Sequence, residues 1–279
     1  MIPDAGRAPL DAAALRAAAV RPGGLWRAVE VTERTGSTNS DLLARAVGGE
    51  PEGLVLAAEE QSAGRGRLGR TWVSPPRAAL TFSVLLRPPA ALRARLGWLP
   101  LLAGVAVAAA VRAVAGVDAE LKWPNDILAA APGPPGTRGK LGGILAEAVG
   151  DAVVVGTGLN VSTAAAELPE PGPGALPATS LRLAQAGSLD RGALLAGILA
   201  GLERRYRAWA VFGDTERSGL RAEYTALCAT LGRRVQVELP GGRALDGLAG
   251  DVDEDGRLLV SVPPGAEVPV AAGDIVHLR

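Results

Sequence analysis

The longest uncharged stretch of this chain, residues 96–111, limits the possible folds more than any other feature. It contains Pro100 and is shorter than the roughly 20 apolar residues that a membrane-spanning helix needs. We therefore predict no membrane span, and a helix over residues 98–115 that is buried in a folded core. A chain of 279 residues can bury such a helix, because one domain usually takes about 100–200 residues.

Apolar segments on both sides of this helix have the length and composition of β-strands. Residues 53–58 and 79–86 are predicted strands before it. Residues 140–147 and 152–155 are predicted strands after it, joined as a hairpin at Val149-Gly-Asp151. This order predicts an α+β fold, in which a mixed β-sheet carries helices on one face.

The two ends of the chain differ from its middle in composition. Residues 1–29 are rich in Ala and Arg and predict an N-terminal extension with one short helix. Residues 30–231 are the predicted main domain, which ends in a helical pattern over residues 190–231. From residue 232 the sequence changes to short strands broken by Gly and Pro, so residues 232–279 predict a small β-barrel.

Charge and rare residues exclude several functional classes. Lys+Arg and Asp+Glu both number 29, so the chain lacks the net positive charge that attracts nucleic acids. The single cysteine, Cys228, and the single histidine, His277, exclude a disulfide within the chain and a Cys/His zinc site, and argue against a Ser-His-Asp triad. Charged residues at intervals from Asp4 to Arg16 leave no apolar segment long enough for a secretory leader, so we expect a cytoplasmic protein.

Lysine and asparagine are scarce, and their positions are informative. Of the 29 basic residues only Lys122 and Lys140 are lysines, which marks them as places where a compact ammonium is wanted. The asparagines are equally few: Asn39, Asn125 and Asn160. All five residues fall inside the motifs described next.

An arginine-rich loop follows the first predicted strand. Gly64-Arg-Gly-Arg-Leu-Gly-Arg70 places three guanidinium groups in seven residues, between Gln61 and Trp72. Glycine allows a ligand to approach the backbone, and arginine offers forked donors that fit phosphate or carboxylate oxygens. A solvated basic loop or an RNA-binding segment remains the alternative. Because like charges repel, we expect the loop to be mobile until an anion neutralises it.

Four further motifs each have a structural and a functional interpretation. Ser37-Thr-Asn39 is a helix cap or, through free N–H groups, an anion site. Lys122-Trp-Pro-Asn-Asp126 is a turn, or a site where Asn and Asp hold Mg²⁺ or a ribose. Gly139-Lys-Leu-Gly-Gly143 is a surface turn or a lysine site, and Gly156-Thr-Gly-Leu-Asn160 is weak evidence by itself.

Taken together and in this order, the motifs closely resemble those of the biotin-protein ligases, also called biotin-[acetyl-CoA-carboxylase] ligases. The resemblance is dense over residues 30–165, and the pair GRGRLGR and KWPND is its most specific part. It implies the biotinyl/lipoyl ligase catalytic fold, which is similar to class II aminoacyl-tRNA synthetases. The last segment, Gly273-Asp-Ile-Val-His-Leu-Arg279, fits the SH3-like C-terminal domain of that family.

The resemblance also implies a reaction and its partners. Biotin and ATP, with Mg²⁺, would give biotinyl-5′-adenylate and pyrophosphate, and a lysine of a biotin carboxyl carrier protein or domain of acyl-CoA carboxylases would then attack the adenylate. The chain would supply positioning and charge stabilisation rather than a covalent nucleophile. The implied oligomeric state is a monomer or weak homodimer.

Site residues follow from the same match to the family, and no metal ligand is assigned. The implied catalytic residues are Lys140, Arg65 and Arg67. The implied biotin-binding residues are Ser37, Thr38, Asn39, Gln61, Arg65, Gly66, Arg67 and Lys140. The implied ATP-binding residues are Arg67, Arg70, Trp72, Asn125, Asp126 and Asn160.

Two other functions stay open at this point. A lipoate-protein ligase would share the fold and the adenylate chemistry, although the arginine loop and KWPND argue against it. An RNA-binding protein that uses residues 64–70 belongs to another class and is opposed by zero net charge. Only 36 residues precede Ser37, too few for the N-terminal DNA-binding domain of some ligases, so we expect a monofunctional ligase that binds no DNA.

Overall fold

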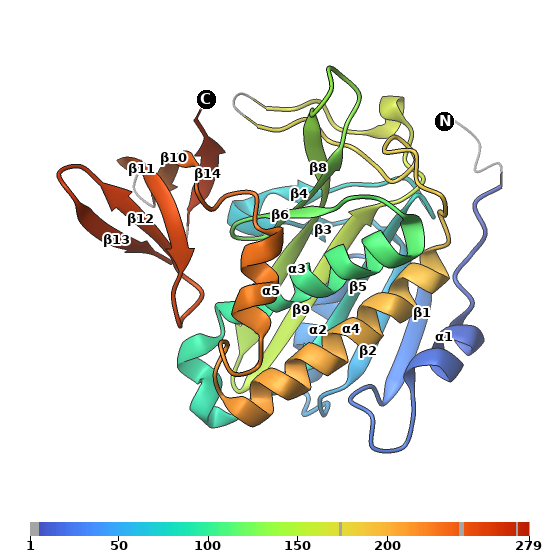
Figure 1. Ribbon diagram of the computed structural model, residues 1–279. Coiled ribbons are helices and arrows are strands. Elements are labelled where there is room, and N and C mark those ends of the chain that lie inside the picture. The colour runs from blue at the N-terminus through green and yellow to red at the C-terminus, as the bar shows by residue number, and fades with distance from the viewer. Residues whose placement is uncertain (1–5, 173–174, 240–242, 272, 279) are drawn as a thin grey trace.

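A computed structural model describes residues 6–172, 175–239, 243–271 and 273–278. Its centre is a seven-stranded sheet in the order β1-β2-β5-β9-β8-β7-β6 (Figure 1). Only β1 and β2 pair in parallel, and every other neighbouring pair in this sheet is antiparallel, so the predicted mixed sheet is confirmed. The strands are β1 (Ala28–Thr35), β2 (Leu54–Gln61), β5 (Ala79–Leu86), β6 (Glu120–Lys122), β7 (Asp126–Ala130), β8 (Arg138–Val149) and β9 (Ala152–Asn160).

The predicted buried helix is α3 (Trp98–Ala110), which continues as a π-helical turn, η3 (Val111–Ala115). It packs between the sheet and α4 (Arg191–Phe212). Among the described residues, Trp98–Ala115 is long and apolar enough to cross a membrane by length and composition alone, yet 72% of it is buried inside the protein. Its packing identifies it as the core helix of the main domain.

The predicted placement of all helices on one face is wrong. α1 (Ala12–Ala19), α3 and α4 cover one face of the sheet, whereas α2 (Thr38–Val47) covers the other. The reason lies in the strands, which are apolar on both sides: Val55 of β2 belongs to the core under α3, and Leu54 and Leu56 belong to a second core that includes Leu42 of α2. A sheet buried on both faces needs cover on both.

The predicted helical segment 190–231 is two helices, α4 and α5 (Leu220–Leu227). Gly213 ends α4 with a positive φ of 66°, a backbone conformation that glycine adopts without strain. At the other end of α4, Arg191 forms a buried ion pair with Glu59 of β2, at 2.6 Å, and donates to the carbonyl oxygen of Ala8. The N-terminal extension is thereby fastened to the main domain.

The C-terminal segment forms a five-stranded antiparallel sheet in the order β13-β12-β11-β10-β14. In the described residues its two edge strands do not pair, so the predicted small β-domain is present with an open sheet. The indoles of Trp98 and Trp123 donate to the carbonyl oxygens of Asp253 and Gly256, which docks this sheet on the main domain. Its strands are β10 (Arg234–Leu239), β11 (Arg243–Val252), β12 (Leu258–Val262), β13 (Ala266–Val270) and β14 (Asp274–His277).

Candidate active site

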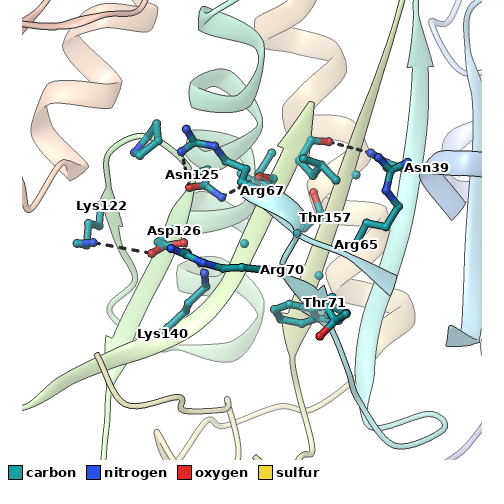
Figure 2. Close-up of a pocket in the computed structure, with 18 of the residues that line it drawn as sticks. Asn39, Arg65, Arg67, Arg70, Thr71, Lys122, Asn125, Asp126, Lys140 and Thr157 are labelled. Atoms are coloured by element: carbon teal, nitrogen blue, oxygen red, sulfur yellow. Dashed lines mark hydrogen bonds and ion pairs between the residues drawn. The ribbon is translucent and has the colours of Figure 1, made fainter. Parts of the chain in front are cut away.

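A cavity of about 330 Å³ lies where the arginine loop, the start of α2, the turn from β6 to β7, and strands β8 and β9 meet. Figure 2 shows Asn39 and Arg65 at one end of it and Lys122 and Asp126 at the other, with Arg67 between them. All but one of the predicted site residues line this cavity: Ser37, Thr38, Asn39, Gln61, Arg65, Gly66, Arg67, Arg70, Trp72, Asn125, Asp126 and Lys140.

The exception is Asn160, which is not among the residues that line the cavity. Its side chain is 5% exposed and donates to the carbonyl oxygen of Thr179 at 3.0 Å. Leu181 N donates back to the carbonyl oxygen of Asn160, so the segment after residue 177 covers the end of β9. Asn160 therefore fastens this segment and does not reach the cavity.

The first turn of α2 carries a buried polar network at one end of the cavity. Ser37 caps the helix, as predicted, with its hydroxyl accepting from Ser40 N. Thr38 donates from its backbone N–H and its hydroxyl to Gln61 Oε1, at 2.8 and 3.0 Å. Ser83 Oγ lies 2.7 Å from Thr38 Oγ1 and donates to Asn39 Oδ1 at 2.6 Å. These contacts fix side chains that could orient a polar, uncharged ligand group.

Sequence reasoning missed Ser83, although a signal was present. It is a hydroxyl in the middle of β5, where every residue is buried, and such a group must find a hydrogen-bond partner. A lone serine in an apolar strand thus points to a polar element packed on that face, which here is the start of α2.

The arginine loop has more structure than predicted. Two short strands, β3 (Gly64–Arg65) and β4 (Thr71–Trp72), pair as a hairpin, and the 3-10 turn η1 (Arg67–Gly69) forms its tip. Arg65 pairs with Glu147 at 2.8 Å, and Arg67 donates to Asn125 Oδ1 at 3.1 Å. The loop arginines therefore have acceptors within the protein, and the expected mobility of the loop remains a prediction.

The other end of the cavity gathers both lysines of the chain around one carboxylate. Lys140 Nζ lies 2.6 Å from Asp126 Oδ1, and Lys122 Nζ lies 4.0 Å from Asp126 Oδ2. Burial lowers the pKa of Lys122 and that of Arg67, while Asp126 acts against both shifts. Such a cluster of cations in a partly desolvated cavity suits an anionic substrate. Lys122 was not assigned to the site, although its rarity had marked it.

The glycines of β9 make room for the site. A Cβ atom on Gly158 would lie 2.5 Å from the Trp72 ring, and one on Gly156 would collide with the Asn39 side chain. Among the described residues, Trp72 Nε1 is buried and has no hydrogen-bond partner. An orphaned donor beside a cavity fits a ligand with an acceptor at that position. β9 stays paired with β5 through the glycine motif to Asn160, so the strand runs beyond its predicted end.

The C-terminal sheet also reaches the cavity, which the sequence did not predict. Glu238 of β10 and Ile275, Val276 and His277 of β14 are among the lining residues. His277 Nε2 lies 3.1 Å from Thr230 Oγ1, which accepts from the backbone N–H of Trp123. Burial, with smaller contributions from Lys122 and Arg233, lowers the pKa of His277 to about 4.

Comparison with known families agrees with this geometry. Residues 31–162 match the profile of the biotin/lipoate A/B protein ligase family, and residues 230–278 match the biotin protein ligase C-terminal domain. The first match contains all motifs of the cavity except the C-terminal strands, and the second contains those strands. The fold and the site thus define a protein ligase of the biotin and lipoate class.

Individual relatives indicate which ligase of this class the chain resembles. The chain is 44% identical to biotin–[acetyl-CoA-carboxylase] ligase of Mycobacterium tuberculosis over 98% of this chain and 97% of that protein. It is 31% identical to the bifunctional ligase/repressor BirA of Escherichia coli over 86% of this chain and 70% of that protein. The structure of biotin protein ligase from Aquifex aeolicus in complex with biotin and ATP has a TM-score of 0.73 and 25% identity, over 91% and 100% of the two chains. The chain therefore belongs to the biotin protein ligase family.

Proposed function

We propose that this protein activates biotin with ATP as biotinyl-5′-adenylate and transfers the biotin to a lysine of a biotin carboxyl carrier protein. The observation that carries the proposal is that one continuous cavity joins a polar, uncharged end at α2 to a cationic end at Asp126. Biotin has a polar ureido ring and a carboxylate chain, and ATP is a polyanion, so the two ends suit the two substrates. A relative that matches over nearly its whole length is named for this reaction.

The polar end of the cavity would hold biotin. Ser37, Thr38, Asn39 and Gln61 would contact its ring, because their hydrogen-bonding groups converge there. Arg65, Gly66 and Arg67 would follow the valeryl chain toward the carboxylate. Binding in this order places the carboxylate oxygen near the middle of the cavity.

The cationic end would hold ATP. Arg70, Trp72, Asn125 and Asp126 would face the nucleotide, and Lys140 with Arg67 would lie where carboxylate and α-phosphate meet. A biotin carboxylate oxygen forms a bond to the α-phosphorus, and the bond to pyrophosphate breaks. Neutralising two approaching anions is the main catalytic task, and preorganised cations do it without reorganisation.

A magnesium ion fits this end without a dedicated cage. Within the described ranges there is no group of three or more His, Cys, Asp or Glu that could hold a metal. Mg²⁺ at nucleotide sites commonly takes one or two protein carboxylates together with substrate phosphates. Asp126, with Asn125 beside it, would hold the ion, and the ion would neutralise phosphate charge.

In the second half-reaction, the carrier lysine would attack the acyl carbon of the adenylate, and AMP would leave. The nucleophile of this step is the carrier lysine itself, so the residues of the chain hold the adenylate while the amine approaches. We further propose a cytoplasmic monomer or weak homodimer, with domain boundaries at residues 30–231 and 232–279.

The decisive assay is ATP–pyrophosphate exchange, run separately with biotin and with lipoate. The proposal predicts exchange that depends on biotin and is negligible with lipoate. Exchange with lipoate alone would support the alternative ligase, and exchange with neither would contradict adenylate chemistry in this cavity.

A further inference from the structure

Arg65 is held by a carboxylate that belongs to none of the ligase motifs. Arg65 Nη2 lies 2.8 Å from Glu147 Oε1, and Arg65 Nη1 donates to Ser40 Oγ at 3.4 Å. The other carboxylate oxygen, Glu147 Oε2, accepts from Asn39 Nδ2 at 2.9 Å. Glu147 therefore connects the arginine loop to the first turn of α2 across the biotin end of the cavity.

Glu147 is well anchored on its own side of this contact. It lies on β8, where it pairs in register with Val154 of β9. Asn39, which donates to it, is 4% exposed and also donates to the carbonyl oxygen of Leu145. The Glu147 side chain is 21% exposed and that of Arg65 is 50% exposed. The carboxylate is thus the fixed partner, and the guanidinium is the group that it holds in place.

We propose that Glu147 is a positioning residue that restrains Arg65, so that the loop over residues 63–71 is less mobile before substrates bind than it would be without this contact. The guanidinium keeps further N–H donors beyond those given to Glu147 and Ser40, so it can bind a substrate anion without leaving the carboxylate. A loop that is ordered in advance loses less conformational entropy when biotin binds, so the binding free energy is more favourable. This inference rests on the proposed biotin site.

The variant Glu147→Gln isolates the charge of this contact. Glutamine keeps an oxygen that can accept from Asn39 but loses the ion pair with Arg65. We expect trypsin to cut after Arg65 and its neighbouring arginines roughly three- to tenfold faster in the ligand-free variant than in the wild type. The KM for biotin in pyrophosphate exchange should rise by a similar factor, with kcat within about twofold.

A matched control exists on the same helix. Glu30 of β1 pairs with Arg45 of α2 at the same distance of 2.8 Å, with side chains 41% and 39% exposed, and neither residue lines the cavity. Glu30→Gln should change neither the tryptic rate nor the KM for biotin. Glu147→Asp, which keeps the charge on a shorter side chain, should recover part of both effects.

Two results would overturn the inference. If Glu147→Gln leaves both the tryptic rate and the KM for biotin at wild-type values, the carboxylate does not position the loop. If it lowers the KM for biotin, Glu147 competes with the substrate for Arg65 instead of presenting it. Absence of biotin-dependent exchange in the wild type would instead refute the proposed function, and the tryptic comparison would still report on the contact itself.

Discussion

Asp126 shares its carboxylate between the only two lysines of the chain. In the absence of substrate this arrangement partly neutralises the ammonium groups and holds Lys140 at the cavity wall. A compact ammonium can follow negative charge as it moves from carboxylate to phosphorus, whereas a planar guanidinium is larger and fixed in geometry. The chain otherwise uses arginine almost everywhere, so a specific demand for lysine best explains Lys140.

Replacing Lys140 should therefore affect chemistry more than folding. We expect Lys140→Ala to slow biotin-dependent pyrophosphate exchange by roughly 10²–10³-fold, the usual effect of removing one preorganised charge. Lys140→Arg should restore only part of the rate. Each variant should also be given preformed biotinyl-adenylate and a carrier protein, to separate adenylation from transfer. Exchange within a few-fold of wild type in Lys140→Ala would show that this residue is not in the reacting centre.

At the scale of elements, the cavity depends on how closely β4 approaches β9. Trp72 of β4 rests on Gly158 of β9, and a Cβ atom there would lie 2.5 Å from the ring. A Cβ atom and a ring carbon cannot lie so close together. The loop hairpin and the sheet therefore fit together in this way only when residue 158 is glycine. The indole of Trp72 is thereby held against β9, at the end of the cavity that is proposed to bind the nucleotide.

The variant Gly158→Ala should displace Trp72. We expect the KM for ATP to rise and the free energy of unfolding to fall by about 1–3 kcal/mol, the usual cost of overpacking. Gly250→Ala in β11 is the control, because the nearest atom that its Cβ would meet is 3.7 Å away. The rate of exchange measured over a range of ATP concentrations gives the KM, and urea unfolding gives the free energy of unfolding. An unchanged KM for ATP would argue against a nucleotide contact by Trp72.

Local sequence signals made much of the fold and of the candidate site predictable. The contacts that were missed depend on packing between residues far apart in the sequence. The cap at Ser37 and the apolar run of β5 predicted the start of α2 and a buried strand, because both depend on near neighbours in sequence. Glu147 gave no signal, since its role depends on an arginine 82 positions earlier and on Asn39, 108 positions earlier. The bond from Asn160 to Thr179 could not be predicted either, because nothing near Asn160 in sequence reveals that a segment after residue 177 covers it.

At the scale of the whole molecule, the C-terminal sheet closes one side of the cavity. Strand β14 brings His277 to Thr230, and the Thr230 hydroxyl accepts from Trp123 N within the KWPND motif. Burial lowers the pKa of His277 and keeps its ring neutral, so the Thr230 hydroxyl either donates to an unprotonated Nε2 or accepts from a protonated one. The junction of the two domains is thus built for an uncharged imidazole.

This requirement makes the stability of the junction depend on pH. The pKa of His277 is about 4 in the folded protein and about 6.5 in the unfolded chain, so acid protonates the unfolded state first. Neutral His277 therefore stabilises the folded protein fully above pH 6.5, and this stabilisation is lost as the pH falls from 6.5 toward 4.

Between pH 7 and pH 5, protonation of His277 should lower the free energy of unfolding by about 1–2 kcal/mol, after a discount for solvent screening. Urea unfolding at the two pH values measures it, and His277→Gln, which can still bond the Thr230 hydroxyl, should remove that part of the loss. An equal loss in the variant would assign the pH dependence to other groups.

The proposed function requires one cavity to hold biotin and ATP end to end. A crystal structure of the protein grown with biotin and ATP tests it most directly. We predict density for biotinyl-5′-adenylate with its ring against the first turn of α2 and its phosphate near Lys140 and Arg67. Density for the adenylate outside this cavity, for example in the second cavity between the N-terminal extension and the start of α4, would contradict a shared site for the two substrates.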